Sequence, residues 1–259
     1  MTTQPRVAAC GFEPVVGDAD TNRNRIASTI GDLPREVTLA IFPELCVSGY
    51  DLDTARELAA PVPGPLTEPL VDVAGEHDIS MVVGVPERGG NAGDPVYNSL
   101  AYVTPDGVEG VYRKRFLWGE EATVFSVGDE PLVTETPAGT LGYLTCYDLN
   151  FPEAALPYAR AGCDLLAVSA AWRTAYLDDW RLLARARAFD GTCYVVASNH
   201  TGSQRDRDHA GHSLIAGPDG TIVDETRADE RAVVTEIAET KLQRARERNP
   251  IAETRNRRA

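Results

Sequence analysis

The 259-residue sequence predicts an α/β fold with a mixed β-sheet, on three observations. Short apolar segments that are typical of buried strands alternate with segments of helical period along the chain. Two hairpin signals, TPDG at Thr104–Gly107 and GPDG at Gly217–Gly220, add antiparallel strands to this alternation. No linker-like or low-complexity stretch divides the chain, so we expect one domain over residues 1–259.

In the first half of the chain, apolar runs predict strands at Arg6–Cys10, Glu36–Phe42, Ile79–Val85, Val96–Val103 and Val108–Tyr112. Helical period predicts a helix at Asp20–Ile30, which Gly31 ends, and another at Leu66–His77 after the rigid turn Pro61–Pro65. The glycine-rich segment Gly84–Gly93 has neither a P-loop nor a dinucleotide-binding pattern, so we interpret it as a flexible loop.

In the second half, strands are expected around Leu141–Leu144 and at Asp164–Ser169, Thr192–Ser198, Ser213–Ala216, Thr221–Val223 and Ala232–Ile237. Helices are expected from Pro152 to about Ala161, at Tyr176–Phe189, and at Thr240–Arg248 before a charged tail that we expect to fray. The two hairpins each follow a similar run of strands and helices, which leaves an internal duplication open.

The stretch GTLGYLTCYDLNFPE at Gly139–Glu153 carries the clearest signal for a chemical site. The apolar residues Leu141–Leu144 suit a buried strand, and Pro152 is typical of a first helical turn. Cys146 should therefore lie at a strand-to-helix corner, near exposed N–H groups that favour a thiolate. From this stretch alone, a nucleophile and a buried structural cysteine are equally well supported.

Composition narrows the function classes. The formal net charge of −14 argues against a nucleic acid or an anionic membrane surface as partner. No apolar run approaches the roughly 20 residues that span a bilayer, and the first residues lack a signal-peptide pattern, so we expect a cytoplasmic protein. The 5 cysteines are widely spaced without a CxxC pair, which indicates neither a disulfide framework nor a zinc ribbon. We expect the other cysteines to be small core residues: Cys10, Cys46, Cys163 and Cys193.

Glu44, Lys114 and Cys146 lie at strand ends or in loops after strands, where the ligand sites of α/β sheets gather. A cysteine nucleophile needs a proton acceptor, which a carboxylate of raised pKa in a dry pocket can supply. A fixed ammonium and backbone N–H groups stabilise the negative charge that an attacked carbonyl or nitrile develops. Lysine otherwise occurs only at Lys241, but spacing alone does not separate these three residues from the other carboxylates of the chain.

A set of motifs in chain order resembles the carbon–nitrogen hydrolase family, often called the nitrilase superfamily. The matching segments are FPELCVSGY at Phe42–Tyr50, YNSL at Tyr97–Leu100, Asp106-Gly107, YRKRFLWGEEATVFSVG at Tyr112–Gly128, CYDLNFPE at Cys146–Glu153, WRLLARARA at Trp180–Ala188 with Val195–Asn199, and GHSLIAGPDG at Gly211–Gly220. The resemblance runs nearly from end to end. It implies a four-layer α-β-β-α sandwich with mixed sheets, which dimerises into a longer stack.

The resemblance also implies catalytic roles for the trio: Glu44 as general base, Lys114 as oxyanion stabiliser and Cys146 as nucleophile. Glu121 matches the second glutamate of the family pattern and would orient the lysine or the substrate, with Glu120 as the alternative. The N–H of Tyr147 would complete the oxyanion hole.

The residues after the cysteine bear on the substrate. Amidase branches of the family tend to have Tyr-Asp here and true nitrilases tryptophan, so Tyr147-Asp148 favours an amide. Asn150 replaces the arginine or glutamate of many amidase branches, which leaves the branch unnamed. Ala171-Trp172-Arg173 departs from the Trp-Pro that is commoner in the family. Arg173 would either bind a substrate carboxylate, which would favour ω-amides of dicarboxylic acids, or form a surface ion pair with Asp178 or Asp179. The other candidate substrate-binding side chains are explained equally well by core packing: Tyr50, Trp118 and Trp172.

Histidine offers two weaker alternatives. His209 and His212 form an H-x-x-H pattern, but it lies in a glycine-containing loop without a third ligand, so we expect no metal. A protease-like Cys–His dyad would use His200 or His212. The glutamate and lysine motifs argue against it.

The sequence therefore predicts a hydrolase without cofactor that releases ammonia from a small linear amide through a Cys146 thioester. Its partners would be the small-molecule amide and further copies of the chain, in a dimer or a multiple of dimers. The same trio could instead act on N-carbamoyl compounds or nitriles. A scaffold of the same fold without turnover is the alternative from another class, and the presence of Glu44, Lys114, Glu121 and Cys146 argues against it.

Overall fold

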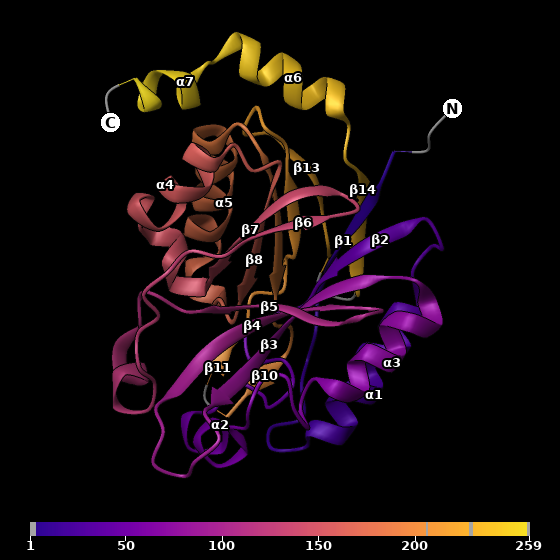
Figure 1. The fold of residues 1–259 in the computed structure, drawn as a ribbon, viewed down its shortest axis with the longest axis vertical. Helices are drawn as coiled ribbons and strands as arrows, with labels where there is room; N and C mark the ends of the chain where they lie inside the picture. The colour runs from indigo at the N-terminus through magenta and orange to yellow at the C-terminus, as the bar shows by residue number, and fades with distance from the viewer. Residues whose placement is uncertain (1–3, 206, 228–229, 258–259) are drawn as a thin grey trace.

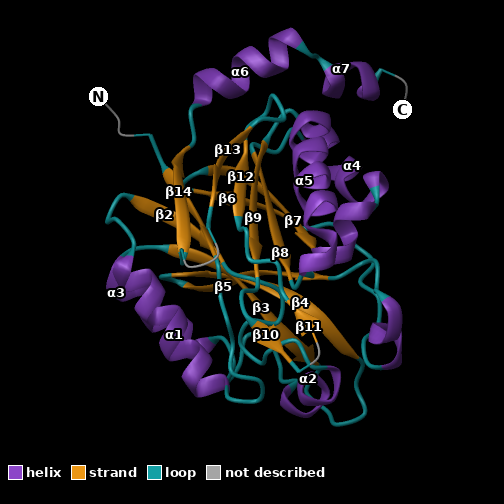
Figure 2. Ribbon diagram, turned by 180° about the vertical axis from the view of Figure 1, so that it is seen from behind, coloured by secondary structure: helices purple, strands orange, loops and turns teal. Residues whose placement is uncertain are grey.

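The computed structural model describes residues 4–205, 207–227 and 230–257, in which two six-stranded sheets pack face to face between two layers of helices (Figure 1). One outer layer holds α1 (Ala19–Asp32) and α3 (Glu68–His77), and the other holds α4 (Pro152–Ala161) and α5 (Leu177–Gly191), as the opposite view also shows (Figure 2). This arrangement confirms the expected four-layer α-β-β-α sandwich.

The amino-terminal sheet has the strand order β14-β1-β2-β3-β4-β5. Its strands are β1 (Arg6–Cys10), β2 (Val37–Ile41), β3 (Ser80–Arg88), β4 (Val96–Thr104), β5 (Gly107–Arg113) and β14 (Ala232–Glu236). β1, β2 and β3 are parallel because helices carry the chain back between them, whereas β4 and β5 follow β3 as antiparallel neighbours. The remote β14 pairs antiparallel with β1.

The carboxy-terminal sheet has the order β13-β12-β9-β8-β7-β6. Its strands are β6 (Val133–Thr136), β7 (Gly139–Thr145), β8 (Leu165–Ala170), β9 (Tyr194–Asn199), β12 (Leu214–Ala216) and β13 (Ile222–Glu225). β7, β8 and β9 are parallel, β12 and β13 continue antiparallel, and β6 pairs antiparallel with β7. The two sheets thus share one pairing pattern, which supports the internal duplication that the sequence left open.

The inner faces of the two sheets form the central core, and the outer faces pack on the helices. On β1, Val7 and Ala9 point into the central core, whereas Ala8 and Cys10 pack on the α1–α3 side. Because both faces of the strand are covered, its sequence reads as a continuous apolar run rather than as an alternating pattern.

The structure corrects the flexible loop expected at Gly84–Gly93, because β3 continues to Arg88. A Cβ atom at Gly84 would lie 2.2 Å from the backbone nitrogen of Leu45 and 2.5 Å from the carbonyl oxygen of Pro43. Glycine is needed here so that the segment after β2 can approach β3 closely, which is one of glycine's uses in strands.

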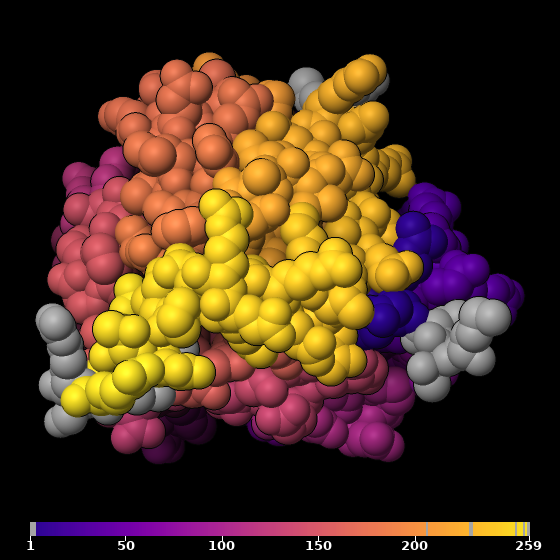
Figure 3. Space-filling model, turned by 90° about the horizontal axis from the view of Figure 1, so that it is seen from above, coloured from indigo at the N-terminus to yellow at the C-terminus, as the bar shows by residue number. Residues whose placement is uncertain are grey.

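Several elements were not expected from the sequence: α2 (Leu52–Leu58), α7 (Ile251–Asn256), β10 (Ser203–Gln204), β11 (Arg207–Asp208) and the short 3₁₀ helices η1 (Gly119–Thr123), η2 (Cys146–Asn150) and η3 (Thr174–Tyr176). The expected α6 (Glu239–Arg248) and α7 lie across one end of the sandwich (Figure 3). The fraying expected for the tail is wrong at Ile251–Asn256, because α7 packs against α4 and α5. Residues 258–259 lie outside the described residues.

None of the helices in the described ranges combines the length and apolar character that crossing a bilayer requires.

Candidate active site

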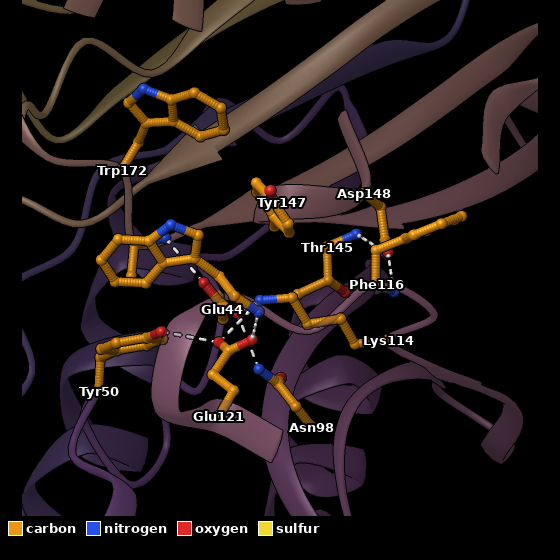
Figure 4. A network of polar contacts seen from close by, with 12 residues as sticks. Glu44, Tyr50, Asn98, Lys114, Phe116, Glu121, Thr145, Tyr147, Asp148 and Trp172 are labelled. Atoms are coloured by element: carbon orange, nitrogen blue, oxygen red, sulfur yellow. Dashed lines mark hydrogen bonds and ion pairs between the residues drawn. The ribbon is translucent and has the colours of Figure 1, made fainter. Parts of the chain in front are cut away.

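A buried ion cluster lies beyond the ends of two strands of the amino-terminal sheet. Lys114 directly follows β5, and Glu44 follows β2 after Phe42-Pro43. The Nζ atom of Lys114 lies 2.7 Å from Oε1 of Glu44 and 2.8 Å from Oε1 of Glu121 (Figure 4). All three side chains are buried, so removing one would leave an uncompensated charge in a dry site. The structure therefore brings three of the predicted residues into one unit.

Glu44 is held on both carboxylate oxygens. Oε1 also accepts a hydrogen bond from Nδ2 of Asn98 at 2.7 Å, and Oε2 accepts the N–H of Ala171 at 3.1 Å. Burial raises the pKa of Glu44 above its ordinary value, although the charge of Lys114 opposes the rise. A carboxylate of raised pKa is suited to accept a proton near neutral pH.

Lys114 keeps its positive charge. Burial by itself would lower the pKa of Lys114, because it disfavours the charged ammonium. The negative charges of Glu44 and Glu121 outweigh burial, and the pKa of Lys114 lies well above its usual value. A fixed ammonium can therefore stabilise an anion that forms beside it.

Cys146 lies at the predicted corner. It directly follows β7 and begins η2, and its φ of 44° falls in the left-handed region, which non-glycine residues seldom adopt. It is partly exposed, whereas the other four cysteines are buried, as their sequence context predicted. Strained backbone of this kind is concentrated at functional sites.

The protonation expected for Cys146 was wrong. Burial raises the pKa of the Cys146 thiol well above its usual value, and the charge of Glu44 raises it further. The opposing effects of Lys114 and of the N–H of Ala171 are smaller. The resting group is therefore a neutral thiol rather than a thiolate, and it needs a base to become a nucleophile.

Glu121, rather than Glu120, belongs to the charge cluster. Glu121 is buried, whereas Glu120 is exposed on η1. Oε1 of Glu121 accepts the hydroxyl of Tyr50 at 2.7 Å, and Oε2 accepts the N–H of Trp118 at 2.7 Å. Hydrogen bonds therefore connect Tyr50 and Trp118, two of the predicted substrate-binding residues, to the ion cluster.

Asp148 is a buried carboxylate whose role the sequence did not reveal. Its Oδ1 accepts the N–H groups of Arg115–Phe116 at 3.2 and 2.8 Å, and its Oδ2 accepts the N–H of Thr145 at 2.9 Å and the hydroxyl of Tyr112 at 2.7 Å (Figure 4). Burial raises the pKa of Asp148. These bonds hold the segment after β5 against the turn after β7, and so join the two sheets at the site.

A cavity of about 180 Å³ opens over Cys146 and Tyr147. The predicted substrate-binding side chains all line it: Tyr50, Trp118, Trp172 and Arg173. Asn150, Tyr176, Asp179 and Arg207 complete the lining, and of these only Arg207 comes from the β10–β11 segment. That segment is polar and has no hydrophobic period, so nothing in its sequence points to a pocket.

The surface ion pair considered for Arg173 does not form in the described part of the chain. The nearby Asp178 lies 4.0 Å from Arg181, and Asp179 lines the cavity without pairing with Arg173. Arg173 therefore lines the cavity without an ion-pair partner among the described residues.

Of the histidines in the alternative sites, His200 and His212 have other partners, whereas the ring nitrogens of His209 have no hydrogen-bond partner among the described residues. Nε2 of His200 lies 2.5 Å from the carbonyl oxygen of Glu44, and Nδ1 of His212 lies 2.8 Å from Glu225. Burial lowers the pKa of His200 to about 3 and that of His209 to about 4. Within the described residues, no group of three or more His, Cys, Asp or Glu side chains could hold a metal ion.

Comparison with known proteins extends this picture beyond the site to most of the chain. The model of the family described as carbon-nitrogen hydrolase matches residues 6–249. A probable nitrilase of Schizosaccharomyces pombe is 32% identical over 88% of this chain and 86% of its own length. The 2-oxoglutaramate amidase of Bacillus subtilis is 31% identical over 95% of both chains. The solved structure of Nit3 from Saccharomyces cerevisiae, a member of the nitrilase superfamily, superimposes with a TM-score of 0.90 at 27% identity over 98% of this chain and 97% of that chain.

These matches agree with the fold, the order of the motifs and the buried Glu44–Lys114 pair beside Cys146. The protein is accordingly a hydrolase that acts on carbon–nitrogen bonds other than peptide bonds. The chain belongs to the carbon–nitrogen hydrolase family, in the amidase-like branch of the nitrilase superfamily.

Proposed function

We propose that the protein hydrolyses a small linear amide to a carboxylic acid and ammonia, with Glu44, Lys114 and Cys146 as its catalytic triad. The observation that carries the proposal is the fully buried Glu44–Lys114–Glu121 cluster next to a cavity that opens on Cys146. The family match over residues 6–249 supports treating the chain as one catalytic domain.

The proposed first half-reaction forms a thioester. Sγ of Cys146 attacks the amide carbon while Glu44 takes the thiol proton, so a C–S bond forms and the carbonyl oxygen becomes an oxyanion. Lys114 and the N–H of Tyr147 stabilise this oxyanion. Glu44 then gives its proton to the amide nitrogen, the C–N bond breaks, and ammonia leaves.

The second half-reaction regenerates the enzyme. Glu44 takes a proton from water, the resulting hydroxide attacks the thioester carbon, and the C–S bond breaks as the acid is released. The sulfur recovers its proton from Glu44, which balances the cycle. Glu121 fixes the position of the Lys114 ammonium throughout.

An amide is the favoured substrate for two reasons. Tyr147-Asp148 follows the nucleophile, as in amidase branches of the family, and a relative that covers 95% of the chain is named an amidase. Hydrolysis of N-carbamoyl compounds by the same triad would instead yield carbon dioxide together with an amine. Hydrolysis of a nitrile would yield a carboxylic acid and ammonia, as amide hydrolysis does. Product analysis therefore separates the N-carbamoyl case, and the substrate that is consumed separates a nitrile from an amide.

We also propose that the active form is a homodimer. The family resemblance implies a dimer, and α5 presents Leu182 and Phe189, which are 62% and 45% exposed and lie seven residues apart on one helical face. Sedimentation velocity should show a dimer for the native protein and a monomer for Leu182→Glu. A native monomer would contradict this part of the proposal.

The test is ammonia release from a panel of aliphatic amides, ω-amides, glutamine and N-carbamoyl amines. Turnover of an amide that is lost in Cys146→Ala and kept in Cys193→Ala is the expected result, because Cys193 is a buried cysteine away from the cavity. Retained turnover in Cys146→Ala would overturn the proposed nucleophile. A folded native protein that turns over no member of the panel would count against the proposal and support the scaffold alternative.

A further inference from the structure

The hairpin formed by β10 and β11 carries two arginines with different surroundings. Arg205 pairs with Asp51 at 2.8 Å and is 63% exposed. Arg207 lines the cavity above Cys146, and within the described ranges its guanidinium forms no ion pair. A cation without a protein carboxylate, at the wall of a small substrate cavity, is suited to bind an anion.

The position of Arg207 is fixed by the aromatic wall of the cavity. Its guanidinium carbon lies 5.1 Å from the ring centre of Tyr50 and 5.7 Å from that of Trp118. Such stacking engages the flat face of the guanidinium and leaves its N–H edge free for a bidentate contact. The hydroxyl of Tyr50 donates a hydrogen bond to Glu121. The ring that contacts Arg207 is therefore itself fixed to the cluster of Glu44, Lys114 and Glu121.

The hairpin is joined at both ends to the segments that build the cavity. At its start, the side-chain oxygen of Gln204 accepts the N–H of Tyr50 at 2.8 Å. At its end, the N–H of Ala210 donates to the carbonyl of Trp172 at 2.8 Å, and Arg173 forms a β-bridge with His209. Arg173 is therefore positioned by the same interactions as the hairpin, and both arginines line one cavity.

The charge of the cavity lining favours an anionic substrate. Arg173 and Arg207 contribute two positive charges, against the single carboxylate of Asp179. This local excess occurs in a chain whose formal net charge is −14, so it contrasts with the rest of the protein. Two guanidinium groups near one small cavity match a carboxylate better than they match a neutral acyl chain.

We propose that Arg207, together with Arg173, binds a carboxylate at the end of the substrate remote from the amide. The preferred substrates are then monoamides of short dicarboxylic acids, and this inference rests on the proposed amide hydrolysis. The cavity of about 180 Å³ limits the acyl chain to a few carbons between the two groups. Arg207 is a specificity-determining residue because its contact lies at the end of the substrate away from the reacting carbon.

The kinetic test compares glutaramate with valeramide, which has the same chain length but no carboxylate. Arg207→Gln should lower the ratio of kcat/KM for glutaramate to that for valeramide by about 10- to 100-fold, since a hydrogen bond to a charged group is lost. Arg205→Gln removes a charge from the same hairpin outside the cavity and should leave the ratio unchanged. An unchanged ratio in Arg207→Gln, or an equal fall in both variants, would overturn the inference.

A binding measurement separates this inference from the proposed reaction. Titration calorimetry with glutarate should show about 10-fold or weaker affinity for Arg207→Gln than for the native protein, and native affinity for Arg205→Gln. If no amide is turned over but this difference appears, the proposed reaction fails while the carboxylate site stands. Equal glutarate affinity in all three proteins would overturn the site itself.

Discussion

The two sheets share one strand pattern but contribute different chemistry. Each has three parallel strands, an antiparallel pair after them and an antiparallel edge strand beside the first. After the second parallel strand, the amino-terminal sheet places Glu44 and the carboxy-terminal sheet places Ala171. After the last strand of the antiparallel pair, the first places Lys114 and the second places Thr226.

The first parallel strands show the reverse division. β7 is followed directly by Cys146, whereas β1 is followed by Gly11-Phe12. The proposed base and the ammonium therefore follow strands of one sheet, and the proposed nucleophile follows a strand of the other. Neither half holds a complete set of these residues, so their geometry depends on how the two sheets pack. Asp148 joins the two halves there, as does Glu44 through the N–H of Ala171.

The largest expected effect is that of removing the central charge of the amino-terminal sheet. Lys114→Met leaves Glu44 and Glu121 buried without a counter-charge, which should cost about 3–5 kcal/mol of unfolding free energy. Loss of the oxyanion stabiliser should also lower kcat by about 10²–10³-fold or more. Urea unfolding and steady-state kinetics measure the two effects.

Lys241→Met is the matched control, because Lys241 is the other lysine of the chain and makes only a partly exposed contact with Asp219 at 3.8 Å. Native stability in Lys114→Met would contradict the idea that the cluster is one unit.

Glu44→Gln tests the base while keeping the shape of the site. We expect kcat/KM to fall by about 10²–10⁴-fold, with a smaller change in stability than Lys114→Met causes. In the native protein the rate should rise as pH rises through the pKa of Glu44, because only the carboxylate accepts the thiol proton. Burial raises that pKa, so the acid limb should lie above the range of an ordinary glutamate.

The Glu44→Gln variant should lack the acid limb in its pH–rate profile. Glu87→Gln is the control, since Glu87 is a buried carboxylate of the same sheet that pairs with Arg113 away from the cavity. If Glu44→Gln keeps the rate of the native protein, Glu44 is not the general base.

Asp148→Asn should weaken the junction between the two sheets. The NH₂ group of the asparagine would face backbone N–H groups whose hydrogen bonds the carboxylate of Asp148 now accepts. This loss should cost about 1–3 kcal/mol of unfolding free energy. If kcat falls further in Asp148→Asn than in an equally destabilised control, Asp148 positions the residues of the site. An equal fall in both variants would mean that Asp148 acts only through overall stability. Asp164→Asn is that control, because Asp164 accepts the N–H of Thr140 and pairs with Arg246 within the carboxy-terminal half.

The smallest effect concerns the β10–β11 segment, which follows β9 and has no counterpart after β3. Burial lowers the pKa of His209 to about 4, and both ring nitrogens lack a hydrogen-bond partner in the described residues. Below the ordinary histidine pKa of 6.5 the unfolded chain binds a proton that the folded protein refuses, so stability falls as pH falls from 6.5 to about 4.

His209→Phe should reduce the slope of stability against pH in this window by up to about 1.4 kcal/mol per pH unit. Urea midpoints measured across the window give the slope. His77→Phe, at an exposed position on α3, should leave the slope as it is. An unchanged slope in His209→Phe would show that His209 takes up its proton equally in the folded and unfolded chain.

The strands, the main helices and the corner at Cys146 could be predicted from the sequence, because each depends on apolar period and turn chemistry within one short segment. Glu44 and Lys114 needed the family resemblance, since their shared ion pair joins positions 70 residues apart. Asp148 was not predictable because its partners Arg115–Phe116 lie in the irregular segment after β5, more than 30 residues away in the sequence. The neutral state of Cys146 depends on burial and on Glu44, neither of which the local sequence shows.

The pairing of β14 with β1 also has a consequence for the chain during its synthesis. Arg6 lies opposite Glu236, so the sheet that carries Glu44 and Lys114 stays incomplete until the ribosome has released residues 232–236. Until then β1 has an open edge, which is the kind of strand that joins neighbouring chains in aggregates. We therefore expect nascent chains that lack residues 232–236 to expose this edge and to carry an aggregation risk.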